Sequence, residues 1–161
     1  MPRDEELTFA DHMGRFHARR YGYPPMVGRV LGYLLVCVPP EQTIAELSDA
    51  LLASRSAITG ALSVLESTDS VRRSRAAGER SDRVRLDFAS AQARAFDASE
   101  YQELADLARE GLAVVDDAAP ERSATLREME AFAEFLVESI RALGAEWEAR
   151  HEQLRAEGRL S

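Results

Sequence analysis

Short side chains with hydroxyl groups, together with one arginine, follow one face of a helix predicted over residues 55–68. Hydroxyl and guanidinium groups can bond base edges or phosphates, and short side chains allow a helix to lie deep in a DNA major groove. The N-terminus of a helix also favours a phosphate. The residues predicted to face DNA here and at the start of the preceding helix are Thr43, Ser54, Arg55, Ser56, Thr59, Gly60 and Ser63. The alternative is a helical hairpin inside a bundle, with solvated serines and threonines.

Two short helices must position this polar face. The segment from Thr43 to Glu46 has the pattern of a capping box, in which each residue's side chain accepts the other's backbone N–H. Ser54 is a favourable N-cap for the second helix, which turns Ile58 and Leu62 inward. The brief turn between the two helices predicts a helix-turn-helix motif.

An arginine-rich hairpin is predicted after the second helix. Residues 71–85 contain six arginines against Glu79 and Asp82, and residues 83–88 alternate between apolar and polar side chains, as a half-buried strand does. We predict that Arg80, at the tip of the loop, enters a minor groove. The arginines predicted to line the adjacent phosphates are Arg72, Arg73, Arg75, Arg83 and Arg85. The alternative is a solvated edge strand whose charge only prevents aggregation.

Long helices account for most of the remaining chain. Residues 4–21 and about 121–154 are predicted helices, and the second carries two interleaved rows of apolar residues at seven-residue spacing. Such a seam needs a partner helix, so we predict a homodimer. The predicted dimer residues are Leu126, Met129, Leu136, Ile140, Leu143 and Trp147.

The expected fold class is mainly α with a small β-hairpin wing. The expected domains are an N-terminal dimerisation helix (residues 1–25), a winged helix-turn-helix DNA-binding domain (26–90) and a C-terminal helical dimerisation domain (91–161). The formal net charge of −8 lies entirely in residues 91–161, which hold eight arginines and sixteen acids. This distribution argues against a non-specific nucleic-acid binder and leaves the hairpin as a basic contact element.

No catalytic set, metal site or cofactor motif is visible in the sequence, so we expect neither an enzyme nor a bound cofactor. Cys37 is the only cysteine and lies in an apolar run, which favours a buried structural thiol over a redox sensor. No apolar run is long enough to span a membrane and no secretory signal is visible. We therefore expect a cytoplasmic protein that does not bind membranes.

Several runs resemble the MarR superfamily, specifically its GbsR-like branch. They are residues 28–35 (GRVLGYLL), 43–47 (TIAEL), 54–59 (SRSAIT) and 78–80 (GER). Residues 106–112 and 119–129 also resemble the mycobacterial MarR-type repressors of lipid- and drug-exporting pumps of the resistance–nodulation–division type. In four places the sequence departs from the pattern. Leu52 and Asp69 stand where glycines are frequent, Val84 replaces a frequent wing aromatic, and Ser81 replaces a second arginine at the wing tip.

The resemblance implies a winged helix-turn-helix dimer whose second motif helix reads the major groove and whose wing reads the minor groove. It also implies a ligand, bound between the dimer lobe and the DNA lobe, that releases the operator. An apolar lining would suit a small hydrophobic or lipid-like effector. The residues predicted to line such a pocket, which are otherwise ordinary core or dimer residues, are Phe16, Tyr21, Tyr23, Met26, Leu34, Phe96 and Tyr101.

These observations favour a homodimeric transcriptional regulator that binds a pseudo-palindromic operator in double-stranded DNA. It would be a ligand-released repressor of a transporter or efflux operon. The alternative is a non-enzymatic protein-interaction module on a winged-helix scaffold, which the acidic helical region would favour.

Overall fold

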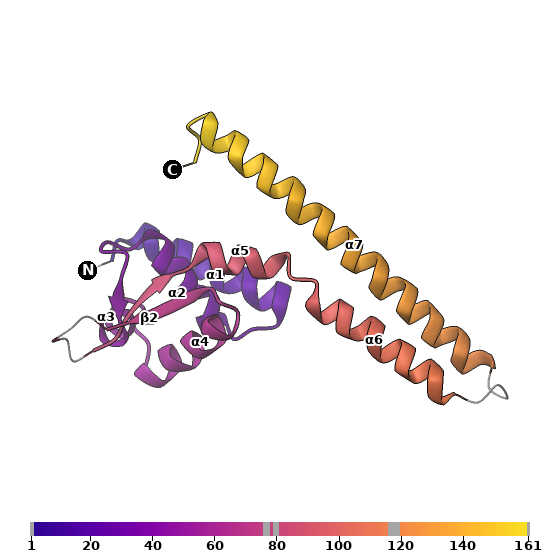
Figure 1. The fold of residues 1–161 in the computed structure, drawn as a ribbon. Coiled ribbons are helices and arrows are strands. Elements are labelled where there is room, and N and C mark those ends of the chain that lie inside the picture. Colours follow the sequence, from indigo (N-terminus) through magenta and orange to yellow (C-terminus); the bar gives the residue numbers. More distant parts are fainter. Residues whose placement is uncertain (1, 76–77, 79–80, 116–119, 161) are drawn as a thin grey trace. The chain divides into compact units, whose positions relative to one another are not determined.

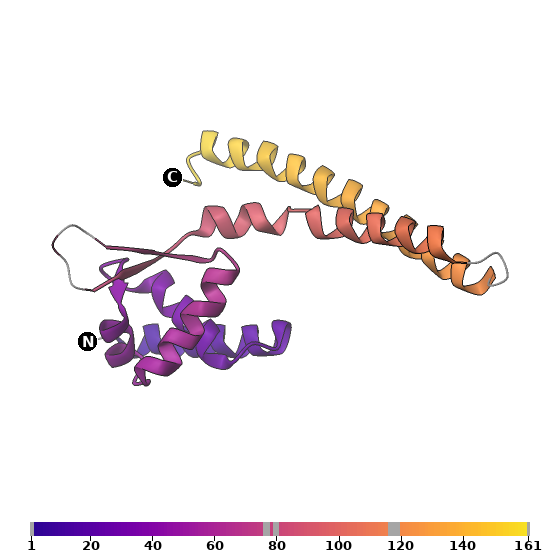
Figure 2. The same ribbon diagram turned by 60° about the horizontal axis from the view of Figure 1, so that its bottom comes forward.

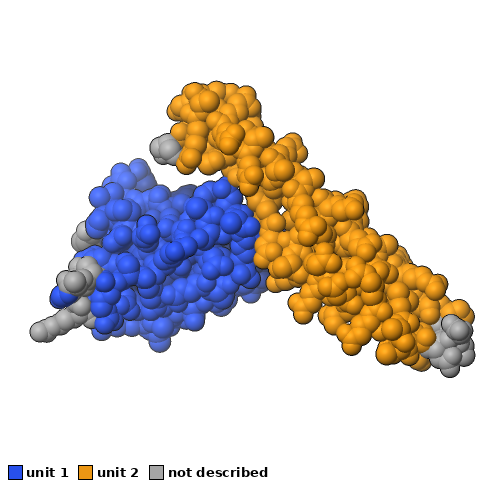
Figure 3. Space-filling model, viewed as in Figure 1, with its two compact units in different colours: residues 1–94 blue, residues 95–161 orange. Residues whose placement is uncertain are grey.

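The computed structural model describes residues 2–75, 78, 81–115 and 120–160. The chain divides into two compact units, residues 1–94 and residues 95–161 (Figure 3). Most described residues are helical, and one small antiparallel sheet lies in the first unit. The predicted fold class, mainly α with a small hairpin, is therefore confirmed.

Unit 1 begins with four helices: α1 (Asp4–Tyr21), α2 (Pro25–Val36), α3 (Ile44–Ala50) and α4 (Arg55–Ser67) (Figure 1). Three strands form its antiparallel sheet: β1 (Gln42–Thr43), β2 (Val71–Ser74) and β3 (Arg83–Leu86), in the order β1-β3-β2. The short helix α5 (Phe88–Ala95) follows β3.

Close packing of α1 against α2 forms one side of this unit. A Cβ atom placed on Gly28 would lie 2.3 Å from the backbone oxygen of Met13, so only glycine fits at this crossing. This contact gives a physical reason for one glycine of the 28–35 run. The core continues through α3, α4 and the sheet, where Leu47, Ile58 and Val84 are fully buried.

Two details of the sheet differ from the sequence prediction. Phe88 was expected to continue the second strand, but it begins α5 and is 71% exposed. Strand β1 was not predicted, because two residues are too few to show an alternating pattern. It pairs with β3, with Gln42 opposite Val84 and Thr43 opposite Arg83, and so joins the start of α3 to the hairpin.

Unit 2 contains α6 (Ser99–Val114) and α7 (Pro120–Ala156), which pack side by side as an antiparallel pair (Figures 1 and 2). Ala105 and Ala108 of α6 and Ala133 of α7 are fully buried, which allows close approach. The Arg109 guanidinium in α6 donates to Glu130 at 2.7 Å and Glu134 at 3.0 Å in α7. These charged hydrogen bonds fix the alignment of the two helices.

The two helices of unit 2 differ in length. Helix α7 has 37 residues and α6 has 16. At the usual rise per residue, the first spans about 55 Å and the second about 24 Å. The longer helix therefore has stretches that α6 does not cover.

Candidate nucleic-acid interface

Helix α4 presents a narrow polar surface, as the sequence predicted. Arg55, Ser56, Thr59, Gly60 and Ser63 are all exposed. The opposite side of the helix is buried in the core of unit 1 through Ile58, Ala61, Leu62 and Leu65. The exposed face therefore carries no long side chain except Arg55 at its start.

The N-terminus of α4 is capped as predicted. The Ser54 hydroxyl accepts the backbone N–H of Ala57 at 3.2 Å, and its oxygen lies 3.0 Å from the Ser56 hydroxyl. Ser54 therefore has a structural role, whereas the side chains further along the exposed face are available to a ligand.

The predicted capping box of α3 is also present. The Thr43 backbone N–H and hydroxyl both donate to Glu46 Oε2, at 2.7 and 2.9 Å, and the Glu46 backbone N–H donates to the Thr43 hydroxyl at 3.2 Å. The bond from the Thr43 backbone is the main reason that the pKa of Glu46 lies below its ordinary value. Glu46 is thus ionised beside β1.

Leu52 and Asp69, the two departures from the glycine pattern, adopt the backbone conformation that glycine favours. Leu52 has φ +50° and Asp69 has φ +54°. Asp69 ends α4, and the Ser70 N–H donates to the Leu65 carbonyl at 2.8 Å to close that end. Both turns therefore form without glycine, although a leucine in this region is strained.

The strand register decides which hairpin arginines face outward. Val71 is opposite Leu86, Arg72 opposite Arg85, Arg73 opposite Val84 and Ser74 opposite Arg83. Since directly opposed residues share a face and successive residues alternate, Arg72, Arg83 and Arg85 lie on the face away from the buried valines. Arg73 lies on the same face as Val71 and Val84.

Arg73, one of the predicted DNA contacts, is held by an acid of another element, and its contact with DNA stays a prediction. Its guanidinium donates to both carboxylate oxygens of Glu66 in α4, at 2.5 and 3.1 Å, and is half-buried. This bidentate pair anchors β2 to α4. The sequence could not show it, because the acid is supplied by a different element.

Two other hairpin arginines are paired with acids near the strand ends. Arg75 donates to Asp82 at 2.7 Å across the base of the loop, and Arg72 donates to Asp87. Exposed pairs of this kind contribute little to stability, so a phosphate can replace the carboxylate at little cost. The Arg83 guanidinium nitrogen Nη1 lies 3.8 Å from the Glu46 carboxylate oxygen Oε2. Arg80, the predicted wing-tip residue, lies outside the described residues.

Arg85 is an outward-facing residue, and the sequence already placed it among the hairpin arginines predicted to line phosphates. It is exposed and forms no ion pair with any residue that the structure describes. The alternation of residues 83–88 already placed Arg85 on the wet side of the strand. The structure adds that the nearby carboxylates lie against other arginines: Asp87 is paired with Arg72, and Glu46 is near Arg83.

The residues predicted to form an effector pocket are divided between the two units. Leu34 is buried in the core of unit 1, and the rings of Tyr21 and Tyr23 stack with centroids 5.6 Å apart. Phe96 lines a pocket in unit 2 together with Gln102 and Arg141. A shared pocket for the seven residues remains a prediction.

The predicted dimer residues lie along α7. Leu126 packs over Gly111 of α6 in the same chain, and its seven-residue neighbour Ala133 is fully buried there, so α6 covers part of the seam. Leu143 is 56% exposed, and Met129, Leu136, Ile140 and Trp147 are partly exposed. Phe132 and Phe135, which the heptad pattern did not include, are more than half exposed.

The described residues contain no group of three or more histidine, cysteine, aspartate or glutamate side chains arranged to hold a metal ion. No helix in the described ranges is long and apolar enough to cross a membrane. Cys37 is buried, its thiol lies 3.4 Å from the Pro39 carbonyl oxygen, and burial raises its pKa. This environment agrees with a structural thiol.

A capped helix with a slim exposed face, a tight turn before it and a basic hairpin after it define a winged helix-turn-helix protein, a class to which many transcriptional regulators belong. Comparisons with known proteins agree. The model of the MmpR5-like MarR family of transcriptional regulators matches residues 90–151. The HTH-type transcriptional regulator MmpR5 of Mycobacterium tuberculosis is 37% identical over 129 residues, which cover 76% of this chain and 74% of that protein.

A crystal structure of a transcriptional regulator is also similar, with a TM-score of 0.74 and 31% identity over 90% of this chain and 99% of that one. The chain belongs to the MarR family of transcriptional regulators, and its relatives in this group are regulators rather than enzymes. The GbsR-like branch named from the sequence is not addressed by these matches and stays a prediction.

Proposed function

We propose that this protein is a homodimeric repressor that binds a pseudo-palindromic operator through α4 and the outer face of its hairpin. The observation that carries the proposal is the joint exposure of the slim face of α4 and of Arg85 in one compact unit. A helix that carries only short side chains can approach base edges closely, and arginines beside it contact phosphates.

Specific roles follow from the geometry. Ser56, Thr59 and Ser63 would contact base edges, and Arg55 would contact a phosphate at the start of the helix. The phosphates of the flanking DNA would be contacted by Arg72, Arg83 and Arg85. Arg80 keeps its predicted role at the wing tip.

Two motifs are needed to read a pseudo-palindrome, with half-sites about one helical turn apart. The apolar residues exposed on unit 2, including Phe132, Phe135 and Leu143, support a second copy of the chain as the partner. Because residues 106–112 and 119–129 resemble pump repressors, the regulated genes would encode an exporter. The protein would act in the cytoplasm. Release of the operator by an apolar effector belongs to the same proposal.

The proposal is tested by gel shift with the DNA upstream of the protein's own gene and of any neighbouring transporter gene. We expect a discrete complex that survives an excess of unrelated DNA and weakens steeply as salt is raised, because bound arginines release counterions. Complexes that unrelated DNA competes away equally well would contradict it. That result would favour the protein-interaction module instead.

A further inference from the structure

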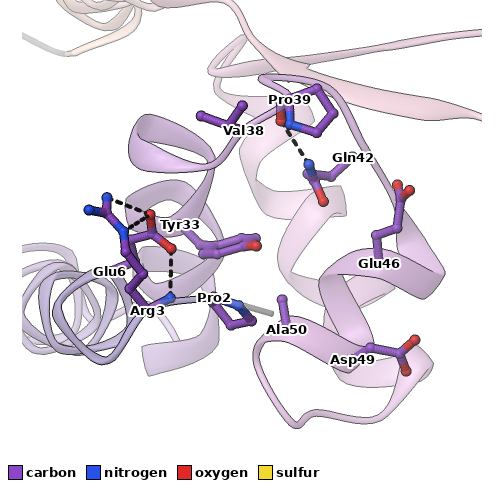
Figure 4. Close-up of a pocket in the computed structure, with 10 residues that line it drawn as sticks. All are labelled: Pro2, Arg3, Glu6, Tyr33, Val38, Pro39, Gln42, Glu46, Asp49 and Ala50. Carbon is purple, nitrogen blue, oxygen red and sulfur yellow. Dashed lines mark hydrogen bonds and ion pairs between the residues drawn. The ribbon is translucent and has the colours of Figure 1, made fainter.

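Unit 1 contains a pocket of about 670 Å³. None of the α4 side chains predicted to read DNA lines this pocket. It lies between the N-terminal end of α1, the C-terminal end of α2 with the following loop, and α3 (Figure 4). This volume is within the range of small-molecule sites in proteins. The lining residues are Pro2, Arg3, Glu6, Tyr33, Val38, Pro39, Gln42, Glu46, Asp49 and Ala50.

Tyr33 is a buried polar side chain directed into this pocket. The residue is only 7% exposed, and Figure 4 shows its hydroxyl pointing away from Glu6 toward α3. The hydroxyl has no hydrogen-bond partner among the described residues, whereas every fully buried side-chain nitrogen or oxygen in that part of the chain has one. Solvent in the pocket therefore reaches the hydroxyl, which is free to bond a ligand.

Gln42 contributes a second buried polar group. It is 5% exposed, and its side-chain nitrogen donates to the Pro39 carbonyl at 2.7 Å. This bond fixes the amide so that its oxygen is directed away from Pro39, on the side of Tyr33 and Ala50 (Figure 4). The pocket wall thus offers a fixed hydrogen-bond acceptor next to the tyrosine hydroxyl.

The charge of the lining is negative. The lining contains three acids, Glu6, Glu46 and Asp49, and one basic residue, Arg3. The Arg3 guanidinium already donates to Glu6 at 2.9 and 2.7 Å. Asp49 forms no ion pair with any described residue. The site is therefore rich in acceptors and poor in free donors, which disfavours an anion and suits a cation that carries N–H groups.

We propose that this pocket binds a small organic ammonium compound with a compact apolar body. The ammonium group would lie on the side of Glu46 and Asp49 and donate to the Gln42 oxygen and the Tyr33 hydroxyl oxygen. The apolar body would pack on Val38, Pro39 and Ala50. This ligand class differs from the lipid-like effector expected from the family resemblance, and the site lies within unit 1.

The experiment is a nuclear magnetic resonance titration of the full, ¹⁵N-labelled chain with benzylamine. Benzyl alcohol and benzoate serve as probes of matched size that are neutral and negatively charged. We expect saturable shifts at the Gln42 side-chain amide and at the Glu46 and Asp49 backbone amides. Benzoate should bind at least about tenfold more weakly, since its charge opposes the carboxylates of Asp49, which has no ion pair with a described residue, and of Glu46, which has only Arg83 at 3.8 Å.

Two conservative variants locate the site. Tyr33→Phe keeps the ring and removes the hydroxyl, and should weaken benzylamine binding about fivefold. Asp49→Asn should weaken it about two- to fivefold. Glu138→Gln, which removes one exposed charge in α7, is the matched control and should bind as the unmodified chain does.

Saturable shifts that map to other residues, equal affinity for benzoate and benzylamine, or no saturation at all would overturn the proposal. So would unchanged binding in both Tyr33→Phe and Asp49→Asn. Because no DNA is present in the titration, its failure leaves the proposed DNA-binding function unaffected.

Discussion

Arg72 and Arg85 lie directly opposite each other on adjacent antiparallel strands, on the outer face of the hairpin. Like charges at such positions destabilise a sheet, because their side chains are close. Arg72 is neutralised by Asp87, but Arg85 has no carboxylate among the described residues. A bound phosphate would supply the missing negative charge, so the arrangement favours the complex over the free protein.

Replacing Arg85 should therefore affect binding and stability in opposite directions. In Arg85→Gln the long side chain remains but the charge is lost, so the dependence of log K on log salt should fall by about one unit of slope. The free energy of unfolding should rise by roughly 0.2–1 kcal/mol as the repulsion disappears. Gel shifts over a salt series and urea unfolding measure the two effects. Arg19→Ala, an exposed change in α1, is the control, and an equal effect of both variants on binding would count against the assignment.

The exposed face of α4 should determine sequence preference. Thr59→Asn should alter which bases are selected from a randomised operator library while leaving the salt slope unchanged, because no charge is lost. Ser54→Ala should instead lower the free energy of unfolding by about 1 kcal/mol, since it removes the cap of α4. Selection followed by sequencing, together with thermal unfolding, separates these roles. Identical base preferences for Thr59→Asn and the unmodified chain would show that this face does not read DNA.

The apolar flank of α7 should hold the proposed dimer together. Leu143→Glu places a charge on a residue that is 56% exposed in the single chain, and it should shift the protein to monomers in sedimentation velocity. Ala145→Glu, two residues further along and therefore on the opposite face of the same helix, adds the same charge and should leave the dimer intact. A monomeric unmodified chain, or two variants with the same assembly state, would refute the predicted interface.

The capping box of α3 should make stability depend on acid pH. The pKa of Glu46 is lowered in the folded protein, so its stabilisation is complete above the ordinary glutamate pKa and is lost as pH falls through the folded value. Glu46→Gln should lower the free energy of unfolding by up to about 1 kcal/mol at pH 7. The difference from the unmodified chain should shrink as pH falls below the ordinary glutamate pKa and vanish below the folded value. Urea unfolding over a series of acid pH values tests this, and a difference that stays the same throughout the series would contradict the role of the charge.

The thiol of Cys37 should be unreactive in the folded protein. Burial raises its pKa, so the thiolate fraction at neutral pH is smaller than that of a free cysteine. Iodoacetamide should therefore modify the native chain slowly and the urea-unfolded chain rapidly, as mass spectrometry would show. Fast native modification that also releases operator DNA would reveal a redox-sensing role.

Local rules account for what the sequence alone determined. The capping box at Thr43, the N-cap at Ser54, the inward face of α4 and the long helix α7 all depend on residues within a few positions of each other. Hydrogen bonds and side-chain spacing at that range are encoded directly in the sequence. The mainly α winged fold and the family resemblance could be predicted for this reason.

Only the tertiary structure decided which charged groups are free. Arg73 is paired with Glu66, and Arg85 has no carboxylate partner in the described ranges, because strand register and the approach of α4 set those distances. The negatively charged pocket likewise joins Tyr33 to residues from α1, α3 and the loop before it. Whether a side chain is available to a ligand depends on contacts between residues far apart along the chain, and no local pattern specifies them.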